Sequence, residues 1–503
     1  MLGRGNTAAR AVLALAALAL GLAPAANATP TAGLPPIRHV FLIVLENKDY
    51  SEAYQLYSSS DPYLSQTLPS MGAMIPYYFG TGHASADNYI ALISGQPPTA
   101  DTKSDCNPAG AGNEVGTASD SYGVAQTGGC WYPPNFSTVA DQLVGTGLTW
   151  RGYVEGMQGN CSATGIPGGG YAEKHNPFPY FGSLLDSGQC AANDVPLYPA
   201  TDTDQSTAGS NLGVDLQSVA TTPNFSFITP NLCNDGHDDC TNASSAPESP
   251  PQTQDELAQA DAFLRKWVPV ILASPAYKQD GMLMIAFDEG DVSPTALDSC
   301  CSEPTTDPDG TPPGGEGSSG VYSPGPGGGQ VGAVVLSPYI APGTQSDQCY
   351  NHYSFLHTVE DLFGLPYLAE AAKDNSNQAG GVESFGSDIF TNPTGADRSD
   401  RPHRPKRRGR SGLRDHRPAW SDRALVRHRV AAGPPPGLRS GHADRIRDLR
   451  RATARRGVRL HRARRVPAAV RDRLRVREPG LRRGAGSRDA VQLQDGPRRR
   501  GHV

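Results

Sequence analysis

The stretch of sequence that decides the fold is HVFLIVLEN, residues 39–47. It is an apolar run that stops at Glu46-Asn47. A run of this length is typical of a strand that a parallel sheet buries on both faces. The same pattern recurs at residues 225–229, 282–287 and 331–336, and polar or turn-forming residues follow each run. We therefore expect at least four buried strands.

Helical patterns separate these runs, at residues 137–143, 254–270 and 352–363. Strands that alternate with helices predict an α/β fold with a mainly parallel central sheet flanked by helices. In such sheets ligands bind beyond the carboxyl ends of the strands, so the residues after each strand are the first candidates for function. The long connections are rich in Gly, Pro, Ser and Asp and are expected to be surface loops: residues 99–135, 187–222, 234–253 and 291–330.

Acidic and amide side chains follow three of the four predicted strands. Glu46-Asn47 and Asp288-Glu289 come directly after two of them. The third strand leads to a segment that contains Asp235 and His237. Each group alone is also what an ordinary polar turn contains. Carboxylates crowded at one edge of a sheet would repel one another unless a cation lay between them, so together they predict a site for a divalent metal cation.

A helix is expected to begin near Ser85, because small polar residues precede an apolar helical stretch in segment 82–95. One interpretation is an N-cap, in which Ser85 or Asp87 satisfies free backbone N–H groups. The other is a nucleophile, because the helix dipole and the open N–H groups favour an alkoxide and bind a phosphate. The two interpretations are compatible.

Several histidines lie in polar, turn-rich surroundings. Lys174-His175-Asn176-Pro177 is either a plain loop or a group that binds phosphate or protonates a leaving oxygen. Asp235-Gly236-His237-Asp238 has the character of metal ligands or of an acid and base, since glycine lets the backbone approach an ion. His83 and His352 share such polar contexts, whereas His39 and His357 look structural.

Charge divides the 503 residues into two unlike regions. Residues 1–397 contain 11 Lys and Arg against 41 Asp and Glu, whereas residues 398–503 contain 33 and 9. The acidic region lacks the clustered basic residues that hold a phosphate backbone, so we expect no nucleic acid partner for it. The basic region has one Trp and no Phe, Tyr, Cys or Met, too little to bury a core. We expect an Arg-rich, disordered tail at 394–503, as an out-of-frame reading would produce; the alternative is an arm that binds nucleic acid or a membrane surface.

The N-terminus has the pattern of a secretory signal peptide over residues 1–28. Arg4 and Arg10 precede the apolar residues 11–23, and Ala26-Asn27-Ala28 is a small-x-small cleavage site. The apolar run is too short to span a bilayer. We therefore expect a secreted, extracellular or wall-associated protein without a transmembrane segment. The nine cysteines fit an oxidising destination, and their order along the chain suggests Cys106–Cys130, Cys161–Cys190, Cys233–Cys240, and Cys349 with Cys300 or Cys301.

With these motifs in place, residues 37–368 resemble the bacterial phosphoesterase family of secreted acid phosphatases and phospholipases C, whose fold is similar to that of alkaline phosphatases. The resemblance implies one phosphoesterase domain, at residues 29–393, with disulfide-stapled loops. It rests on short motifs in a fixed order: residues 39–48, 85–89 with 94–95, 174–178, 229–231 with 234–238, 286–289 and 351–354.

The resemblance also implies roles for the candidate residues. Ser85 stands where the wider superfamily keeps its Ser or Thr nucleophile, and the histidines would surround the transferred phosphate or the leaving group. The complete set is Ser85, His175 and His237 for catalysis, His83, Asn88 and Asn176 for substrate binding, and Glu46, Asn47, Asp235, Asp288, Glu289 and His352 for the divalent cation.

The activity expected from this resemblance is hydrolysis of a small-molecule or lipid phosphate monoester by a monomeric acid phosphatase, through a phosphoserine at Ser85. Phospholipase C members commonly have Thr at this position, and no lipid-handling domain follows residue 390. A histidine that must carry a proton to the leaving alcohol favours an acidic optimum. Two alternatives stay open: a phospholipase C that acts on phosphodiesters, and a secreted binding protein that kept the fold without catalysis.

Overall fold

The computed structural model describes residues 33–108, 113–166, 170–238, 240, 253–290, 299–301, 303, 327–373, 382–392 and 394. The predicted signal peptide lies outside the described residues, as does the predicted tail apart from Thr394. The domain boundaries after residues 28 and 393 therefore stay predictions.

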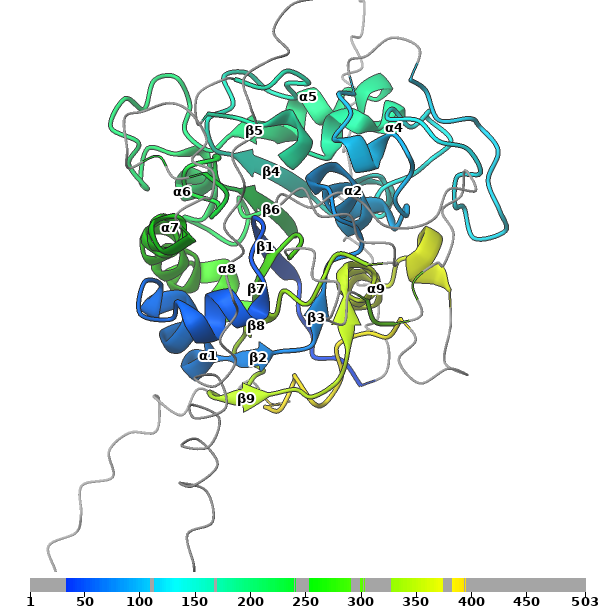
Figure 1. Cartoon of the computed structure of the whole chain (residues 1–503). Helices are drawn as coiled ribbons and strands as arrows, with labels where there is room; N and C mark the ends of the chain where they lie inside the picture. Colours follow the sequence, from blue (N-terminus) through cyan, green and yellow to red (C-terminus); the bar gives the residue numbers. More distant parts are fainter. Residues whose placement is uncertain are drawn as a thin grey trace, which may run out of the picture. The chain divides into compact units, whose positions relative to one another are not determined.

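An eight-stranded sheet forms the centre, with the strand order β5-β4-β6-β1-β7-β8-β2-β9 (Figure 1). From β5 to β7 every neighbouring pair is parallel, whereas β8 is antiparallel to both of its neighbours. A second, two-stranded sheet pairs β3 with β10. The strands are β1 (His39–Leu45), β2 (Ala73–Ile75), β3 (Tyr78–Phe79), β4 (Trp150–Val154), β5 (Asp194–Pro196), β6 (Phe225–Thr229), β7 (Gly281–Phe287), β8 (Ala333–Leu336), β9 (Thr344–Gln345) and β10 (Tyr350–Asn351).

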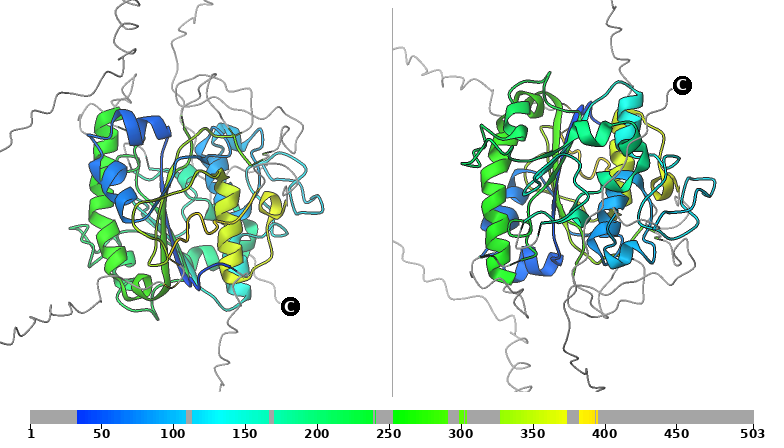
Figure 2. Two further views of the ribbon diagram at one scale, coloured as in Figure 1. Left: turned by 90° about the horizontal axis from the view of Figure 1, so that it is seen from below. Right: turned by 90° about the horizontal axis from the view of Figure 1, so that it is seen from above.

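Helices cover both faces of the sheet (Figure 2). On one face α2 packs against α3 and α9, and on the other α7 packs against α8 and the short helix η2. The α-helices are α1 (Leu68–Met71), α2 (Ser85–Ser94), α3 (Val139–Gly145), α4 (Gly182–Asp186), α5 (Gln189–Asn193), α6 (Asn211–Asp215), α7 (Thr253–Ala273), α8 (Pro275–Asp280) and α9 (His352–Phe363). Short helical turns are η1 (Glu52–Leu56), η2 (Tyr63–Thr67), η3 (Thr102–Ser104), η4 (Glu173–His175), η5 (Phe178–Tyr180) and η6 (Ala369–Ala372).

The predicted α/β fold with a mainly parallel sheet is confirmed. All residues of β1 and β7 are buried, as expected for strands covered on both faces. The predicted run at 331–336 is the strand β8, but it is antiparallel to β7. The sequence pattern contained no information on its direction, because an apolar run reads the same in both orientations.

The structure confirms three of the predicted disulfides: Cys106–Cys130, Cys161–Cys190 and Cys233–Cys240. The fourth prediction is wrong, because Cys300 is joined to its neighbour Cys301 and Cys349 is free. The two sulfurs of Cys161 and Cys190 and a carboxylate oxygen of Asp194 lie within 4.8 Å of one another, close enough to be considered as metal ligands. Their two sulfurs are already bonded to each other, so this group is a staple and not a ligand set.

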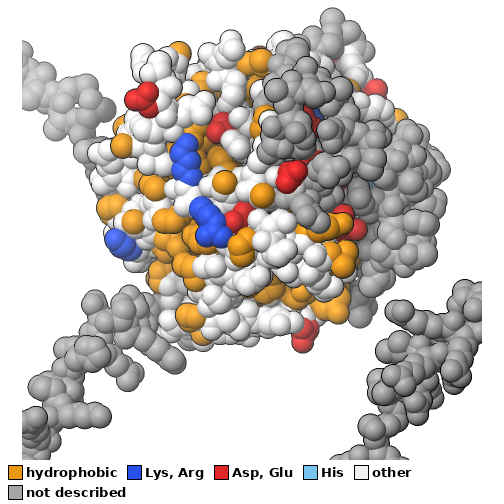
Figure 3. All heavy atoms as spheres, turned by 60° about the vertical axis from the view of Figure 1, so that its left-hand side comes forward, with side chains coloured by type: hydrophobic (Ala, Val, Ile, Leu, Met, Phe, Trp, Pro, Cys, Tyr) orange, Lys and Arg blue, Asp and Glu red, His pale blue; other side chains and the backbone are white. Residues whose placement is uncertain are grey.

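On the face that Figure 3 shows, Lys and Arg side chains are few and separated from one another. Such a surface offers no continuous track for a phosphate backbone there. Among the described residues, no helix is both long and apolar enough to cross a membrane.

Candidate active site

The carboxyl ends of β1 and β7 bring the two predicted acid-amide pairs together. The two strands are parallel and in register up to Leu45 and Phe287, so the residues that follow them become neighbours. The backbone N–H of Asn47 donates to Asp288 Oδ1 at 3.1 Å, and Asn47 Nδ2 donates to Glu289 Oε1 at 3.1 Å. Asn47 has a φ of 54°, a left-handed conformation that Asn tolerates better than most residues.

Ser85 is the first residue of α2 and faces the end of β1. Its Oγ donates to Glu46 Oε2 at 3.0 Å, and both side chains are buried. Tyr89, one helical turn later, donates its hydroxyl to the other oxygen, Glu46 Oε1, at 2.6 Å. No sequence motif gave Tyr89 a role of its own, although residues four apart share a helix face. That spacing is the signal that would have found it.

His175 and Asp235 complete this side of the site. His175 Nε2 lies 3.3 Å from Glu46 Oε2, and its Nδ1 lies 3.4 Å from Asp235 Oδ2. The imidazole stacks on the Tyr89 ring with centroids 5.3 Å apart. The backbone carbonyl of Asp235 accepts from the Glu46 N–H at 2.8 Å, which ties the loop after β6 to the end of β1.

His237 lies at the rim of this group. Its backbone N–H donates to Asp235 Oδ1 at 2.9 Å, and its Nδ1 lies 2.7 Å from Asp238 Oδ1. About a quarter of its side chain, 28%, is exposed, so the ring can exchange protons with solvent. Of the predicted residues, His83 is also buried here, with Nδ1 3.9 Å from Glu289 Oε2.

The contacts of two predicted substrate-binding residues correct their expected role. Asn88 Oδ1 accepts from the N–H groups of Thr81 and Gly82, and its Nδ2 donates to two backbone carbonyls. Asn176 Nδ2 donates to Asp194 Oδ2 at 2.8 Å. Both amides therefore shape loops instead of facing a ligand.

His352, a predicted metal ligand, is likewise engaged through both ring nitrogens. Its Nε2 lies 2.6 Å from the backbone carbonyl oxygen of Asp288, which can only accept, so this nitrogen carries the proton. Its Nδ1 then accepts from the Tyr78 hydroxyl at 3.0 Å. Burial lowers the His352 pKa to about 4, which agrees with a neutral ring. No lone pair is left for a metal, so His352 holds the Asp288 backbone in place.

Other strand-end oxygens fit a cation. Several buried side-chain oxygens in the described part of the chain make no hydrogen bond, although a buried polar atom without a partner is costly, and four of them belong to the candidate residues at the strand ends. Carboxylate and amide oxygens are the donors that hard divalent cations prefer. The four atoms are Asn47 Oδ1, Asp235 Oδ2, Asp288 Oδ2 and Glu289 Oε2.

The raised pKa values of the acids in the site also indicate that positive charge is lacking around them. Burial, then the Asp288 and Asp235 carboxylates, raise the pKa of Glu46 well above its usual value. Burial raises the pKa of Asp288 to about 6 and that of Asp235 to about 7. The pKa of Glu289 is raised by burial and by Asp288. Each carboxylate would ionise more readily if a cation lay among them.

Two lysines that the sequence analysis left without a firm role border the acids. Lys48 Nζ forms a buried ion pair with Glu256 Oε2 on α7 at 2.8 Å. Lys174 Nζ lies 2.8 Å from Asp105 Oδ2, a loop residue that no sequence signal singled out. Burial lowers the pKa of Lys174, but Asp105 and Glu46 raise it more, so the net pKa is above the usual value and the ammonium stays charged.

Four glycines, which we name the glycine floor, pack backbone against backbone beside Asp288. The N–H of Gly80 donates to Gly329 O at 3.0 Å, that of Gly328 to Gly80 O at 2.9 Å, and that of Gly290 to Gly328 O at 2.7 Å. A Cβ on Gly80 would lie 2.5 Å from Asp288 O, and a Cβ on Gly328 would lie 2.1 Å from Gly82 O. These contacts leave no room for a side chain at either position.

Comparison with known proteins adds relatives of several kinds. An acid phosphatase of Aspergillus fumigatus is 24% identical over 337 residues, which are 65% of this chain and 55% of that protein. A probable acid phosphatase of Kluyveromyces lactis is 24% identical over 66% of this chain and 59% of that protein. The chain thus spans little more than half the length of these two fungal relatives. A phosphatidylinositol-3-phosphatase of Mycobacterium tuberculosis is 26% identical over 71% of this chain and 89% of that protein.

Among solved structures, a protein of the alkaline phosphatase superfamily from Vibrio parahaemolyticus aligns with a TM-score of 0.38 at 14% identity, over 67% of this chain and 69% of that one. A sequence model of the phosphoesterase family matches residues 44–366, a span that runs from the end of β1 past α9 and includes every candidate site residue. Because this span is more than half of the chain, the protein belongs to the phosphoesterase family.

Proposed function

We propose that the protein is a cation-dependent phosphoesterase that hydrolyses phosphate monoesters, as an acid phosphatase does. The observation that carries the proposal is the pairing of the Ser85 hydroxyl with Glu46, 3.0 Å apart, at the start of a helix and beside buried oxygens without partners. A hydroxyl in this position can act as a nucleophile toward a phosphorus atom bound at the helix N-terminus.

The residues that would hold the cation are Asn47, Asp235, Asp288 and Glu289, because one side-chain oxygen of each lacks a hydrogen bond within the described residues. When bound, a divalent cation supplies positive charge that lowers the pKa of a nearby hydroxyl and neutralises phosphoryl oxygens. Glu46 faces the same group of oxygens but already accepts from Ser85 and Tyr89. Its part is to orient the nucleophile and to receive its proton.

In the first step Ser85 Oγ attacks the phosphorus, an Oγ–P bond forms, and the bond from phosphorus to the alcohol oxygen breaks. The Ser85 proton passes to Glu46 Oε2, to which the hydroxyl already donates at 3.0 Å. In the second step water attacks the phosphorus, an O–P bond forms and the bond from phosphorus to Oγ breaks. Oγ takes back the proton held by Glu46, the water's proton passes to the histidine that protonated the alcohol, and inorganic phosphate is released.

The leaving alcohol needs a proton, and His237 is the better of the two predicted donors. Burial, then Lys174 and His237, lower the pKa of His175 well below its usual value, so its ring is neutral. Burial also lowers the pKa of His237, but its contacts with Asp238 and Asp235 raise it more, and the net pKa is above the usual value. We therefore assign proton donation to His237 and contact with Glu46 and the phosphoryl group to His175.

Removal and return of metal ions test this function. Hydrolysis of p-nitrophenyl phosphate is measured with the purified protein before and after chelation, and then with single cations added back. We expect turnover to disappear on chelation and to return with at least one divalent cation. Turnover that persists after exhaustive chelation would reject the cation's part, and no turnover with any cation would reject the enzymatic function.

The relatives' names favour a monoester over a diester substrate, since they describe acid phosphatases and a phosphatidylinositol-3-phosphatase. The last of these aligns over 89% of its length, so a phosphoinositide monoester is the second candidate substrate. Parallel assays on p-nitrophenyl phosphate, phosphatidylinositol 3-phosphate and phosphatidylcholine separate the options. Release of a phosphorylated headgroup from phosphatidylcholine would instead support the phospholipase C alternative.

Secretion is part of the proposal and is supported by disulfides in loops distant in sequence, which persist in oxidising compartments. Fractionation of cells that express the full chain, followed by mass determination of the exported product, tests both export and cleavage after residue 28. Intact protein confined to the cytoplasm would contradict it.

A further inference from the structure

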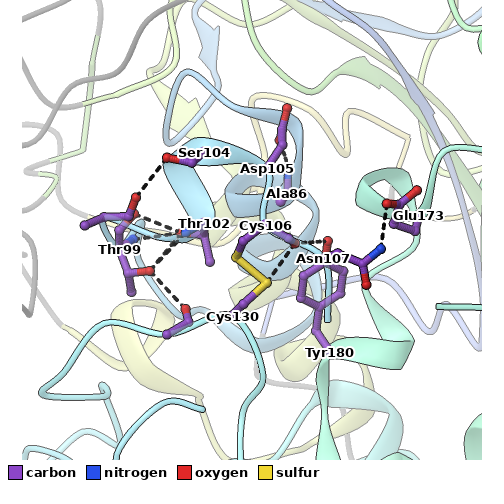
Figure 4. The surroundings of a disulfide bond; sticks show 12 residues. Ala86, Thr99, Thr102, Ser104, Asp105, Cys106, Asn107, Cys130, Glu173 and Tyr180 are labelled. Atoms are coloured by element: carbon purple, nitrogen blue, oxygen red, sulfur yellow. Dashed lines mark hydrogen bonds between the residues drawn. A yellow bond between two sulfur atoms is a disulfide. The ribbon is translucent and has the colours of Figure 1, made fainter. Parts of the chain in front are cut away.

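A loop segment, residues 99–108, which we name the Asp105 strap, is fixed to the body of the protein beside α2 (Figure 4). Thr102 Oγ1 accepts from the Thr99 N–H at 2.8 Å, and the Cys106–Cys130 disulfide anchors the next residues. The Cys106 carbonyl accepts from the Tyr180 hydroxyl at 2.9 Å. The position of Asp105 is therefore determined by contacts on both sides of it.

The Asp105 carboxylate contacts two donors, one of which is the backbone N–H that follows the nucleophile. Its Oδ1 accepts from the backbone N–H of Ala86 at 3.0 Å, and its Oδ2 lies 2.8 Å from Lys174 Nζ. Ala86 directly follows Ser85 in the first turn of α2, where the helix dipole favours an anion. One carboxylate thus uses both an amide and an ammonium that a phosphoryl group at Ser85 would need.

A second observation, on His175, also points to a ligand beside Lys174 and Ser85. His175, the neighbour of Lys174, is 1% exposed, and its Nε2 makes no hydrogen bond among the described residues. That nitrogen lies 3.3 Å from Glu46 Oε2, the same oxygen to which Ser85 Oγ donates. A buried ring nitrogen that makes no hydrogen bond within the described part of the chain therefore contacts the same Glu46 oxygen as the nucleophile.

The exposed fractions of these side chains show which of them a ligand from solvent can reach. Ser85 is 1% exposed and Glu46 is fully buried. The side chains of Asp105 and Lys174 are 30% and 26% exposed. The Asp105–Lys174 pair is therefore accessible to a ligand from solvent, whereas the nucleophile is buried.

We propose that Asp105 is an internal competitor for the phosphate site: its carboxylate holds the Ala86 N–H and Lys174 in the free protein and is displaced by the phosphoryl group of a substrate. After hydrolysis the carboxylate returns to both donors and favours the release of inorganic phosphate. This inference rests on the proposed function and assigns a residue that sets substrate affinity and product release.

The test compares Asp105→Asn with Asp101→Asn, which removes the same charge from the same strap. Asp105 has a φ of 50°, a region that Asn adopts as readily as Asp, so the backbone is kept. Binding of inorganic phosphate to the full chain is measured by calorimetry. Since a competing charge at this distance opposes an anion directly, we expect Asp105→Asn to bind phosphate about tenfold more tightly. Asp101→Asn should bind it as the unaltered protein does.

Kinetics give a second readout that a merely structural role would not move. The KM of Asp105→Asn for p-nitrophenyl phosphate should fall by a similar factor, while kcat stays the same or falls because phosphate leaves more slowly. Asp105→Gly is the second variant should Asp105→Asn fail to fold, because glycine also accepts a positive φ. It should show the same tightening.

The outcomes separate this inference from the proposed function. Unchanged or weaker phosphate binding by folded Asp105→Asn or Asp105→Gly, in a protein whose unaltered form hydrolyses monoesters, overturns the competitor and leaves the function standing. Equal tightening in Asp101→Asn also overturns it, because the effect would then come from general charge. Absence of hydrolysis by the unaltered protein is instead a failure of the proposed function.

Discussion

Buried carboxylates occur in two different settings in this protein. Asp261 on α7 has a donor for each oxygen: Oδ1 accepts from the N–H groups of Tyr63 and Leu64, and Oδ2 accepts from Arg265. Asp288 is just as buried, but only its Oδ1 has donors, and its Oδ2 has none among the described residues. These two acids are therefore alike in burial and differ in their supply of donors, which leaves one oxygen of Asp288 available to a cation.

The largest effect is expected from Ser85→Ala, which removes the proposed nucleophile, the hydroxyl that donates to Glu46. Turnover of p-nitrophenyl phosphate should fall by about 10⁴-fold or more, as with other nucleophile deletions. The melting temperature should stay close to that of the unaltered protein. Ser94→Ala is the matched control, because Ser94 Oγ donates to Ile90 O at the far end of the same helix. Retained activity in Ser85→Ala would reject the nucleophile.

The second test replaces Asp288 and Asp261, the two acids compared above, each with asparagine. Asp288→Asn should lose turnover by at least about 10²-fold, since one cation ligand loses its charge, and added cations should not restore it. Asp261→Asn should keep both its turnover per folded molecule and its response to chelation. Similar losses of turnover in both variants would contradict the assignment of Asp288 as a cation ligand and of Asp261 as a structural residue.

The same two variants should differ in sign when stability is measured in chelator. Asp261→Asn loses its ion pair with Arg265, half of whose side chain is exposed, and should be destabilised by about 1 kcal/mol. Asp288→Asn removes a like charge from a crowd of acids and should be as stable as the unaltered protein or more so. Thermal melting after metal removal checks this. A less stable Asp288→Asn would show that its charge is already compensated without a cation.

Asp194 combines features of both acids, because one of its oxygens has a donor and the other has none in the part of the chain that the structure describes. We expect its ionisation to affect how stability depends on pH. Its Oδ2 accepts from Asn176, and its Oδ1 has no partner among the described residues. Burial, partly offset by that bond, raises its pKa from 3.8 to about 7. The folded form therefore keeps a proton that the unfolded form loses, and this contribution to stability is lost as pH rises from about 4 to about 7.

Asp194→Asn should remove that contribution. Melting temperatures of the variant and the unaltered protein, compared across this pH range, should converge or cross toward the neutral end. Parallel curves at all pH values would mean that Asp194 ionises at the same pH when folded and unfolded.

Much of the sheet edge could be predicted from the sequence, because parallel strands in register carry their following residues to one place. Glu46 and Asp288 are 242 positions apart, yet two apolar runs sufficed to make them neighbours. The same argument does not extend to strands of two or three residues, such as β2 and β9, which are too short to show a pattern. Nor does it give the direction of β8.

Side-chain roles were harder to predict than positions. Asn88, Asn176 and His352 lie near the expected motifs, but each has its polar atoms engaged by local backbone or by neighbouring side chains. A sequence states which polar group is present and not whether the fold already supplies its partners. Asp105 shows the converse, because a residue in an unremarkable loop reaches the nucleophile's helix through the geometry of its strap.

The glycine floor has a consequence for how this site can change. Because Gly80 lies against the backbone of Asp288 and Gly328 against that of Gly82, even a methyl group at either position would push these segments apart. In a randomised library selected for phosphate release, these two codons should return glycine alone, while positions on the Asp105 strap diversify. Adaptation to new phosphate esters would then proceed through substitutions in the Asp105 strap, while Gly80 and Gly328 stay unchanged.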